Sequence, residues 1–312
     1  MTLNDRGVYP KAIILRNCDA KRYLRGRRSM KVGIVGMGWV GASVAASILH
    51  SGLARELLLD DAKPGLAEGE AMDLAHGASF YPTASVRAAS IEEMVDADAV
   101  IIAAGKAGGP KDNRLDLLRL NATIVHDIAR RLSGMRGMLV IVTNPVDVMT
   151  QVAAEASLGR TLDSEPRSIH AQVVGEHGDS EVVRWSGAQL GGVPLRKWPG
   201  WSRERELEIG HEVRNAAYEI IARKGTTNHA IGLVTAALLR WTLRGGRRIL
   251  TISRVQEGAV GIREVAISLP AIVSGSGAVE VIEPEMDAQE REALERSVEV
   301  LRRAYQEARS KP

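Results

Sequence analysis

The amino-acid sequence predicts an α/β protein, with an N-terminal doubly wound parallel sheet and a C-terminal α+β domain. From residue 30 to about residue 150, short apolar runs alternate with helical patterns, which is typical of parallel strands connected by helices. Beyond residue 150, a portion with the pattern of antiparallel strands is followed by long helices and further strands. We therefore expect two domains, at residues 30–150 and 151–312.

The composition excludes several classes of protein. The chain has 312 residues, of which 45% are hydrophobic and 25% are charged, so it is long enough to bury a large core in two lobes. Its longest apolar runs, at 99–104 and 138–142, are far shorter than the roughly 20 residues that a membrane helix needs. We expect neither extensive disorder nor a membrane partner.

Basic residues are concentrated at the N-terminus. Residues 1–29 contain eight Lys and Arg against two acids, whereas the rest of the chain is mildly acidic. This segment allows three interpretations: a targeting peptide, an arm for anionic partners, or a loosely ordered extension before a natural start at Met30. We favour the extension. No nucleic-acid partner is expected, because the sequence has no aromatic and basic pattern of the kind that single-stranded nucleic acid requires.

The single cysteine, Cys18, lies in this extension. The rest of the chain can therefore form no disulfide within itself and no cysteine-based metal site, which fits the reducing cytoplasm. We expect a cytoplasmic protein without a bound metal.

The first expected strand leads into a glycine-rich turn. Residues 31–35 are a short β-branched run, the sequence Gly-Met-Gly-Trp-Val-Gly comes next, and a helix of small residues follows at 42–49. In a dinucleotide-binding Rossmann fold, Gly36 permits the tight turn, Gly38 lets backbone N–H groups approach a pyrophosphate, and Gly41 allows close helix packing. The pattern predicts such a site, although glycines also make ordinary tight turns.

A second apolar strand, at 56–59, ends in two acids, Asp60 and Asp61, some twenty residues past the last glycine. An acid at this place accepts hydrogen bonds from the adenosine ribose and repels a 2′-phosphate. The sequence therefore favours NAD over NADP. Either acid fits the spacing, and an acid after a strand is also a common turn residue.

Two further strands are expected at 99–104 and 138–143. Ligands gather at the carboxyl ends of parallel strands. Gly105 and the run Thr143-Asn144-Pro145-Val146-Asp147 fall at these ends, so we expect them at the ligand-binding edge of the sheet.

The second half continues with a twisted antiparallel portion near 185–195 and a helix over about 203–224. Another helix is expected after Thr227, and strands are expected near 250–253 and 265–269.

The chain ends in an amphipathic helix. Asp287 and Glu290 form a capping box at its start. One face of this helix carries Leu294, Val298, Leu301 and Tyr305. We interpret that stripe as core packing rather than as a partner site.

Several motifs occur in a fixed order along the chain. They are the glycine turn, an expected helix LAEGEAMDLAH at 66–76, Arg114-Leu-Asp-Leu-Leu118 with Asn121, TNPVD at 143–147, Gly175-Glu-His-Gly-Asp-Ser180, and Lys224-Gly-Thr-Thr227. In these motifs the chain resembles the L-lactate/malate dehydrogenase family, over residues 30 to about 305, and it is most similar to the bacterial L-lactate dehydrogenases.

The resemblance implies hydride transfer between NAD and the C2 atom of a 2-hydroxy or 2-oxo acid, with a proton moving to or from the oxygen. His177 inherits the role of general acid and base, which histidine fills with the least change in pKa. Arg114 would close over the substrate and polarise its carbonyl, Asn144 would contact substrate and cofactor, and Thr227 would line the pocket. A homodimer or homotetramer is implied.

The resemblance also assigns the cofactor contacts. By the family's spacing, Asp61 rather than Asp60 binds the ribose. The other implied contacts are Gly36, Gly38, Val40, Gly41, Gly105, Thr143 and Asn144.

The chain departs from the family at the position that distinguishes substrates. Alignment on Pro110 and Arg114 places Gly108 where lactate enzymes have glutamine and malate enzymes have arginine. A glycine has no side chain to pair with a second carboxylate, so the malate signature is absent. The space at Gly108 admits a different side chain on the 2-oxo acid, and Lys106 or Lys111 would supply charge.

A second departure lies between TNPVD and GEHGDS. The family has there a Leu-Asp-x-Ala-Arg pattern, whose Asp orients the histidine and whose Arg binds the substrate carboxylate. Residues 149–174 are shorter than the family's segment by some twenty residues. One alignment retains the aspartate as Asp163. The preferred alignment needs a single deletion and removes both the orienting aspartate and the carboxylate-binding arginine. Arg167 replaces that arginine only if it enters the pocket from a different backbone position.

These departures leave three hypotheses. The first is an NAD-dependent dehydrogenase of the L-lactate type, with malate dehydrogenase as the alternative activity. The second is an NAD-binding member of the family with little or no turnover, because the shortened segment belongs to the substrate domain. The third is an anionic partner for residues 1–29. Some bacterial relatives are regulated by a sugar bisphosphate, which they bind through an arginine of the missing segment and a histidine that matches His170. Because that arginine is absent from the preferred alignment, this regulation stays an open question for the chain.

Overall fold

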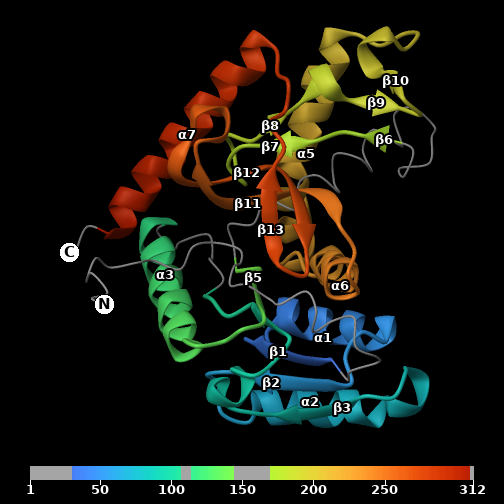
Figure 1. Ribbon diagram of the computed structural model, residues 1–312, viewed down its shortest axis with the longest axis vertical. Helices are drawn as coiled ribbons and strands as arrows, with labels where there is room; N and C mark the ends of the chain where they lie inside the picture. The colour runs from blue at the N-terminus through green and yellow to red at the C-terminus, as the bar shows by residue number, and fades with distance from the viewer. Residues whose placement is uncertain (1–29, 107–113, 144–168, 310–312) are drawn as a thin grey trace.

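The computed structural model describes residues 30–106, 114–143 and 169–309, which form two lobes (Figure 1). The first lobe contains a five-stranded parallel sheet with the strand order β3-β2-β1-β4-β5. Its strands are β1 (Lys31–Val35), β2 (Glu56–Asp60), β3 (Ser85–Ala88), β4 (Ala99–Ile102) and β5 (Met138–Ile141). The order reverses between β1 and β4, which is where such sheets bind ligands.

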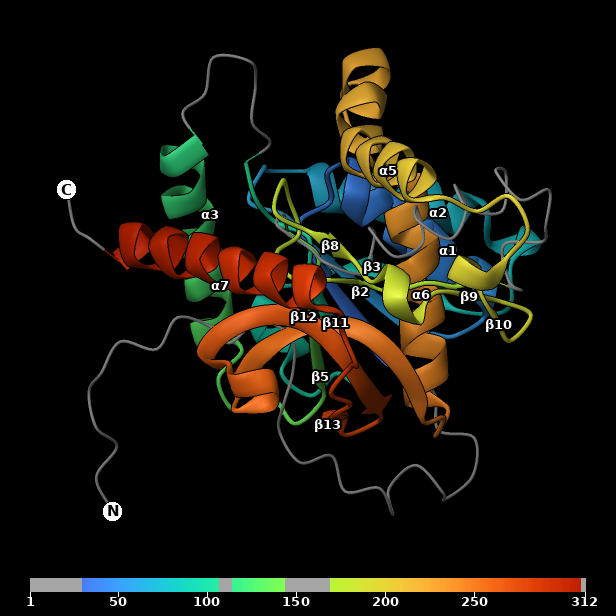
Figure 2. The same cartoon turned by 90° about the horizontal axis from the view of Figure 1, so that it is seen from above.

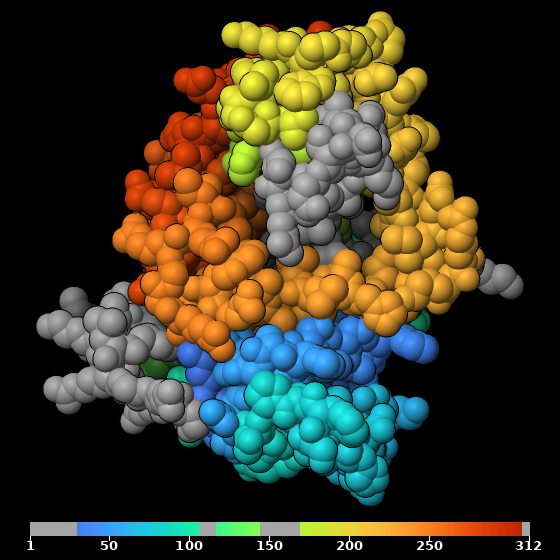
Figure 3. Space-filling view, turned by 90° about the vertical axis from the view of Figure 1, so that its right-hand side faces the viewer, coloured from blue at the N-terminus to red at the C-terminus, as the bar shows by residue number. Residues whose placement is uncertain are grey.

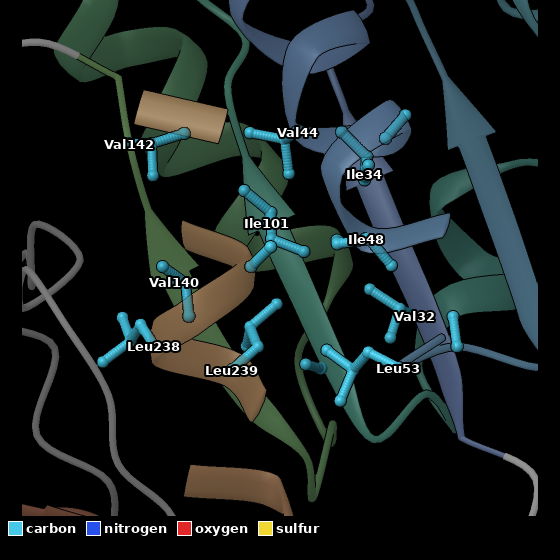
Figure 4. Close-up of a cluster of buried hydrophobic side chains, with 14 of the residues drawn as sticks. Val32, Ile34, Val44, Ile48, Leu53, Ile101, Val140, Val142, Leu238 and Leu239 are labelled. Atoms are coloured by element: carbon cyan, nitrogen blue, oxygen red, sulfur yellow. The ribbon is translucent and has the colours of Figure 1, made fainter. Parts of the chain in front are cut away.

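Helices cover both faces of this sheet. The first lobe has α1 (Trp39–Ser51), α2 (Leu66–His76) and α3 (Arg114–Arg131). One core joins the sheet to α1, α2 and a helix of the second lobe, α6 (His229–Leu243). Its labelled side chains, which come from β1, β4, β5, α1, α6 and the adjoining residues Leu53 and Val142, point toward one another in Figure 4. The other core packs α3 against the opposite face. Doubly wound packing is therefore confirmed.

The second lobe is α+β, as expected. Its largest sheet is antiparallel and consists of β11 (Arg248–Glu257), β12 (Arg263–Ser274) and β13 (Gly277–Val281). The short strands are β6 (Ile169–His170), β7 (Val173–Val174), β8 (Val182–Val183), β9 (Gln189–Leu190) and β10 (Val193–Pro194). The long helices are α5 (Arg203–Lys224) and α7 (Ala288–Arg309). Seen from above, α7 runs along one side of this lobe (Figure 2).

Short 3₁₀ helices connect these elements. They are η2 (Ala78–Phe80), η3 (Ile91–Met94), η5 (Trp185–Gly187), η6 (Leu195–Lys197) and η7 (Ala259–Gly261). None of the helices in the described parts of the chain is long and apolar enough to span a bilayer.

The last helix confirms one expectation and corrects another. The capping box is present, because the Asp287 N–H donates to Glu290 Oε2 at 3.1 Å and the Glu290 N–H donates to Asp287 Oδ1 at 2.9 Å. Leu294 and Val298 are buried in the core under α7. Tyr305 is 44% exposed, so its assignment to the core stripe was wrong. The helix extends past the sheet of its own lobe toward α3, where the Arg119 Nε donates to the Glu307 carbonyl at 3.1 Å.

Two interior helical glycines test the packing between the lobes. A Cβ on Gly232 of α6 would lie 2.5 Å from the Ser43 carbonyl oxygen of α1, whereas a Cβ on the exposed Gly69 of α2 would meet nothing within 4 Å. Gly232→Ala should therefore lower the free energy of unfolding by about 1–3 kcal/mol, because the helices must separate. Gly69→Ala should raise it by about 0.5–1 kcal/mol through helix propensity. Urea unfolding measures both, and equal effects would contradict the packing argument.

Candidate functional site

The glycine turn between β1 and α1 has the geometry that a dinucleotide requires. Gly36 has φ +97°, and a Cβ on it would collide with the backbone of Ala104. A Cβ on Gly41 would collide with the Gly36 carbonyl oxygen, so the helix approaches the turn closely only because of glycine. Gly38 faces open space within 4 Å. The turn therefore brings the N-terminus of a 13-residue helix, where an anion is stabilised, to the exposed surface at Gly38.

Asp61 has a function in the turn that the sequence did not reveal. Its Oδ2 accepts the Met37 N–H at 2.7 Å, and its Oδ1 accepts the Lys63 N–H at 2.8 Å. The carboxylate therefore connects the glycine turn to the end of β2. The hydrogen bond from Met37 places this carboxylate next to the glycine turn.

Asp60 has a different environment. Its carbonyl oxygen accepts the Gly36 N–H at 2.8 Å. Burial raises the pKa of its carboxyl, Arg131 opposes this rise, and Asp61 adds to it. Both acids line a pocket beyond the carboxyl ends of β2 and β3, together with Lys63, Ala89 and Ser90. Through Asp61, whose carboxylate accepts the Met37 N–H, this pocket adjoins the glycine turn.

Gly105 and Thr143 lie together at the same edge of the sheet. The Thr143 hydroxyl donates to the Ala104 carbonyl at 2.7 Å, and a Cβ on Gly105 would lie 2.8 Å from Thr143 Cγ2. Asn121 of α3 binds the next residue from both sides, since its Oδ1 accepts the Lys106 N–H at 2.8 Å and its Nδ2 donates to the Lys106 carbonyl at 3.3 Å. The sequence motif gave Asn121 no role. The structure shows that its side chain binds the backbone of the loop at Lys106.

His177 lies in the loop between β7 and β8. Gly175 at the start of the loop pairs with Ser268 of β12 through two backbone hydrogen bonds of 3.1 and 3.2 Å. Burial lowers the pKa of His177 from 6.5 to about 4, so the imidazole is neutral at neutral pH in this structure. The half-buried imidazole is therefore deprotonated at neutral pH, and its lowered pKa makes it a weaker base than an exposed histidine.

Thr227 lies at the junction of the two lobes, half-buried between α5 and α6. The next residue, Asn228, is buried and accepts the Lys224 ammonium on its Oδ1 at 2.5 Å. Its Nδ2 donates to the Ser43 hydroxyl of α1 at 2.7 Å. The wall that carries Thr227 is thereby connected to the helix that follows the glycine turn. The sequence analysis gave Asn228 no role, because its partner Ser43 lies 185 residues earlier in the chain.

Val40 is the second residue of α1. Several other predicted residues are not placed by the structure. Gly108 and Asn144 lie outside the described residues, as does the shortened segment with Asp163 and Arg167. Arg114 is the first residue of α3. The residues that the structure does describe contain no group of three or more His, Cys, Asp or Glu that could hold a metal ion.

Burial of His177 makes stability depend on pH. The unfolded chain binds the proton near pH 6.5 and the folded chain only near pH 4, so this contribution is complete above pH 6.5 and is lost as the pH falls to about 4. We expect it to amount to at most about 3 kcal/mol. Urea unfolding at pH 7 and pH 4.5 should show a smaller difference for His177→Asn than for the wild type, and an identical difference would contradict the lowered pKa.

Comparison with known proteins identifies the family. The model of the lactate/malate dehydrogenase NAD-binding domain matches residues 30–161, and that of the lactate/malate dehydrogenase α/β C-terminal domain matches residues 149–311. An L-lactate dehydrogenase from Thermus aquaticus is 39% identical over 304 residues, covering 88% of this chain and 98% of that protein. One from Bacillus caldotenax is 37% identical over 308 residues, covering 89% and 97%.

The alignment with the Bacillus caldotenax protein is 308 positions long but contains only 89% of the 312 residues of this chain. Roughly thirty of its positions are therefore gaps in this chain.

The solved structures show the same relationship. The minor L-lactate dehydrogenase from Enterococcus mundtii, in a ligands-bound form, has a TM-score of 0.87 and 33% identity, covering 91% of this chain and 99% of its own. MGS-M5, a lactate dehydrogenase from a deep-sea metagenome library, has a TM-score of 0.85 and 32% identity, covering 91% and 100%. The matched domains, the shared fold and the site together show that this chain belongs to the lactate/malate dehydrogenase family, with an NAD-binding first domain.

Proposed function

We propose that the protein is an NAD-dependent dehydrogenase that interconverts an L-2-hydroxy acid and a 2-oxo acid, in the way of the L-lactate dehydrogenases that it resembles. The observation that carries this proposal is the half-buried, neutral His177 in a loop that hydrogen bonds to β12, α5 and α7 hold in place. It occurs in a chain whose first lobe retains the glycine turn, the acid at the end of β2 and the residues at the ends of β4 and β5.

The cofactor supplies or accepts the hydride at the C2 atom of the substrate. His177 takes the proton from the substrate hydroxyl when the hydroxy acid is oxidised, and returns a proton to the oxygen when the oxo acid is reduced. Arg114 polarises the carbonyl, Asn144 contacts the substrate oxygen, and Thr227 lines the pocket. Since the pKa of His177 is about 4, few molecules carry the proton at pH 7. The reduction should therefore become faster as the pH falls from 8 to 6.

NAD is the proposed cofactor, and Asp61 is the proposed ribose contact. Its carboxylate adjoins the glycine turn and is held there by the Met37 and Lys63 N–H groups. Asp60 and Asp61 line the same pocket, which is the proposed site of the adenosine ribose. Repulsion between these acids and the 2′-phosphate of NADP should make NADH the better substrate.

The part of the proposed site that binds the substrate carboxylate is the least complete. In the alignment with one deletion, the shortened segment between residues 149 and 174 lacks the family's orienting aspartate and carboxylate-binding arginine. The roughly thirty gaps in the alignment with the Bacillus relative favour a shortened chain. This observation supports a second candidate function, an NAD-binding protein with little or no turnover, and losing a charge-assisted carboxylate pair would remove about 1.5–3 kcal/mol of substrate binding.

A panel of oxo acids separates the two candidates. We expect the purified protein to oxidise NADH, and NADPH more slowly, with at least one of pyruvate, oxaloacetate, 2-oxoisocaproate and phenylpyruvate. Oxaloacetate alone would indicate the malate activity, and a bulky acid would fit the space at Gly108. His177→Asn should lower the turnover number by about 10²–10⁴-fold because proton transfer is lost.

The control for this experiment is NADH binding, followed by fluorescence titration, which should be equal in the wild type and in His177→Asn. Saturable NADH binding without turnover against any of the four acids would contradict the dehydrogenase and favour the binding protein.

We also propose a homo-oligomer. Helices α1, α2 and α6, which cover one face of the sheet, expose Trp39 (74%), Met72 (63%) and Leu233 (67%). Figure 3 shows the side of the molecule where segments of both lobes meet. Large apolar side chains exposed on helices from both lobes are typical of a protein–protein interface. A second copy of the chain would bury them.

Light scattering should give a mass of at least two 33.7 kDa chains. Leu233→Asp should shift the protein toward the monomer, because a charge would be buried in the interface. The control is Val193→Asp, which changes an apolar side chain that is 43% exposed on β10. A monomeric wild type would contradict the proposal.

A further inference from the structure

We propose that Ser297, in the C-terminal helix α7, is a positioning residue for proton transfer, because it holds the loop that carries His177. This inference rests on the proposed function, in which His177 exchanges a proton with the substrate. Ser297 lies 121 residues beyond its loop partner Glu176, and it is not part of any motif in the sequence.

Ser297 bonds to the loop on both sides of the histidine. Its hydroxyl oxygen accepts the Glu176 N–H at 2.5 Å, one residue before His177. The Ser180 hydroxyl, three residues after the histidine, lies 3.3 Å from it. Ser180 is also hydrogen bonded to the Glu176 carboxylate, through its hydroxyl at 2.5 Å and its N–H at 3.1 Å. The loop is therefore closed on itself, and Ser297 fixes the closed loop to α7.

The position of Ser297 favours a small residue with a hydroxyl group. Ser297 is 0% exposed, so water cannot replace its hydrogen bond to the Glu176 N–H. A Cβ on Gly175, which has φ +98°, would lie 2.8 Å from its hydroxyl oxygen. The loop and the helix are thus in contact at Gly175, and removal of the hydroxyl would leave a donor without its partner.

The other contacts of the loop come from β12 and α5. Gly175 pairs with Ser268, and the Tyr218 hydroxyl donates to Asp179 Oδ1 at 2.9 Å. These hydrogen bonds, like those of Ser297, lie within the second lobe. The glycine turn and Asp61 belong to the first lobe. Loss of the Ser297 hydroxyl should therefore change proton transfer and leave NADH binding as it is.

The test compares Ser297→Ala with two matched variants. Ser297→Thr restores the hydroxyl and adds one methyl group. Ser186→Ala removes a different serine that holds α7, since the Ser186 hydroxyl donates to Glu290 at 2.5 Å in the first turn of that helix, away from the histidine loop. Ser186→Ala therefore loosens the same helix without removing the hydrogen bond to Glu176.

We expect Ser297→Ala to lower kcat by about 10–100-fold, because displacement of a reacting group by about 1 Å has effects of this size. The KM for NADH should stay within about twofold of the wild type. Ser297→Thr should recover most of the lost kcat, and Ser186→Ala should retain it even where its melting temperature falls. The same loss of kcat in Ser186→Ala, or no loss in Ser297→Ala, would overturn the proposal.

A second readout does not need turnover. Diethylpyrocarbonate acylates neutral, accessible imidazoles, and mass spectrometry of the peptide that contains His177 reports the rate at this one residue. Ser297→Ala should be modified several-fold faster than the wild type and than Ser186→Ala. If the wild type has no His177-dependent turnover, the proposed function fails, while this rate still decides whether Ser297 holds the loop. Equal rates in all variants would overturn the positioning role.

Discussion

Helices α1 and α6 pack against each other where Gly232 meets the Ser43 carbonyl, and the rest of the site depends on this close contact. Helix α1 follows the glycine turn, and α6 follows Thr227. The hydrogen bond from Asn228 to Ser43 lies at the same junction. The distance between the two helices therefore sets the distance between the glycine turn and Thr227. A side chain at Gly232 would change both lobes together.

The surroundings of His177 show how one residue can weaken the fold and serve the chemistry. Burial of an imidazole disfavours its charged form, so the folded chain loses stability in acid. The same burial keeps the base free of a proton at neutral pH and ready to accept one. The loop withstands this because its hydrogen bonds come from β12, α5 and α7 and do not depend on the charge of the histidine.

The sequence predicted much of the fold because its signals are local. The bounds of β1, α2 and α5 agree with the expected ranges, since apolar periodicity and flanking glycines mark their ends. Strand β3 was missed because it has four residues with alternating exposure at the edge of the sheet. The physical roles of Gly36 and Gly41 were predicted correctly. The contacts of Asp61, Asn121 and Ser297 were not predictable, because each joins residues far apart in the sequence.

The place of Ser297 in the chain has a consequence for biosynthesis. Ribosomes add about 5–20 residues per second, so the 121 residues between Glu176 and Ser297 separate their emergence by on the order of ten seconds. During that interval the nascent chain can already complete its parallel sheet and glycine turn. The histidine loop still lacks the helix that holds it. A chain truncated before α7 would therefore contain every residue of the parallel sheet and the glycine turn, but its histidine loop would lack both contacts with Ser297.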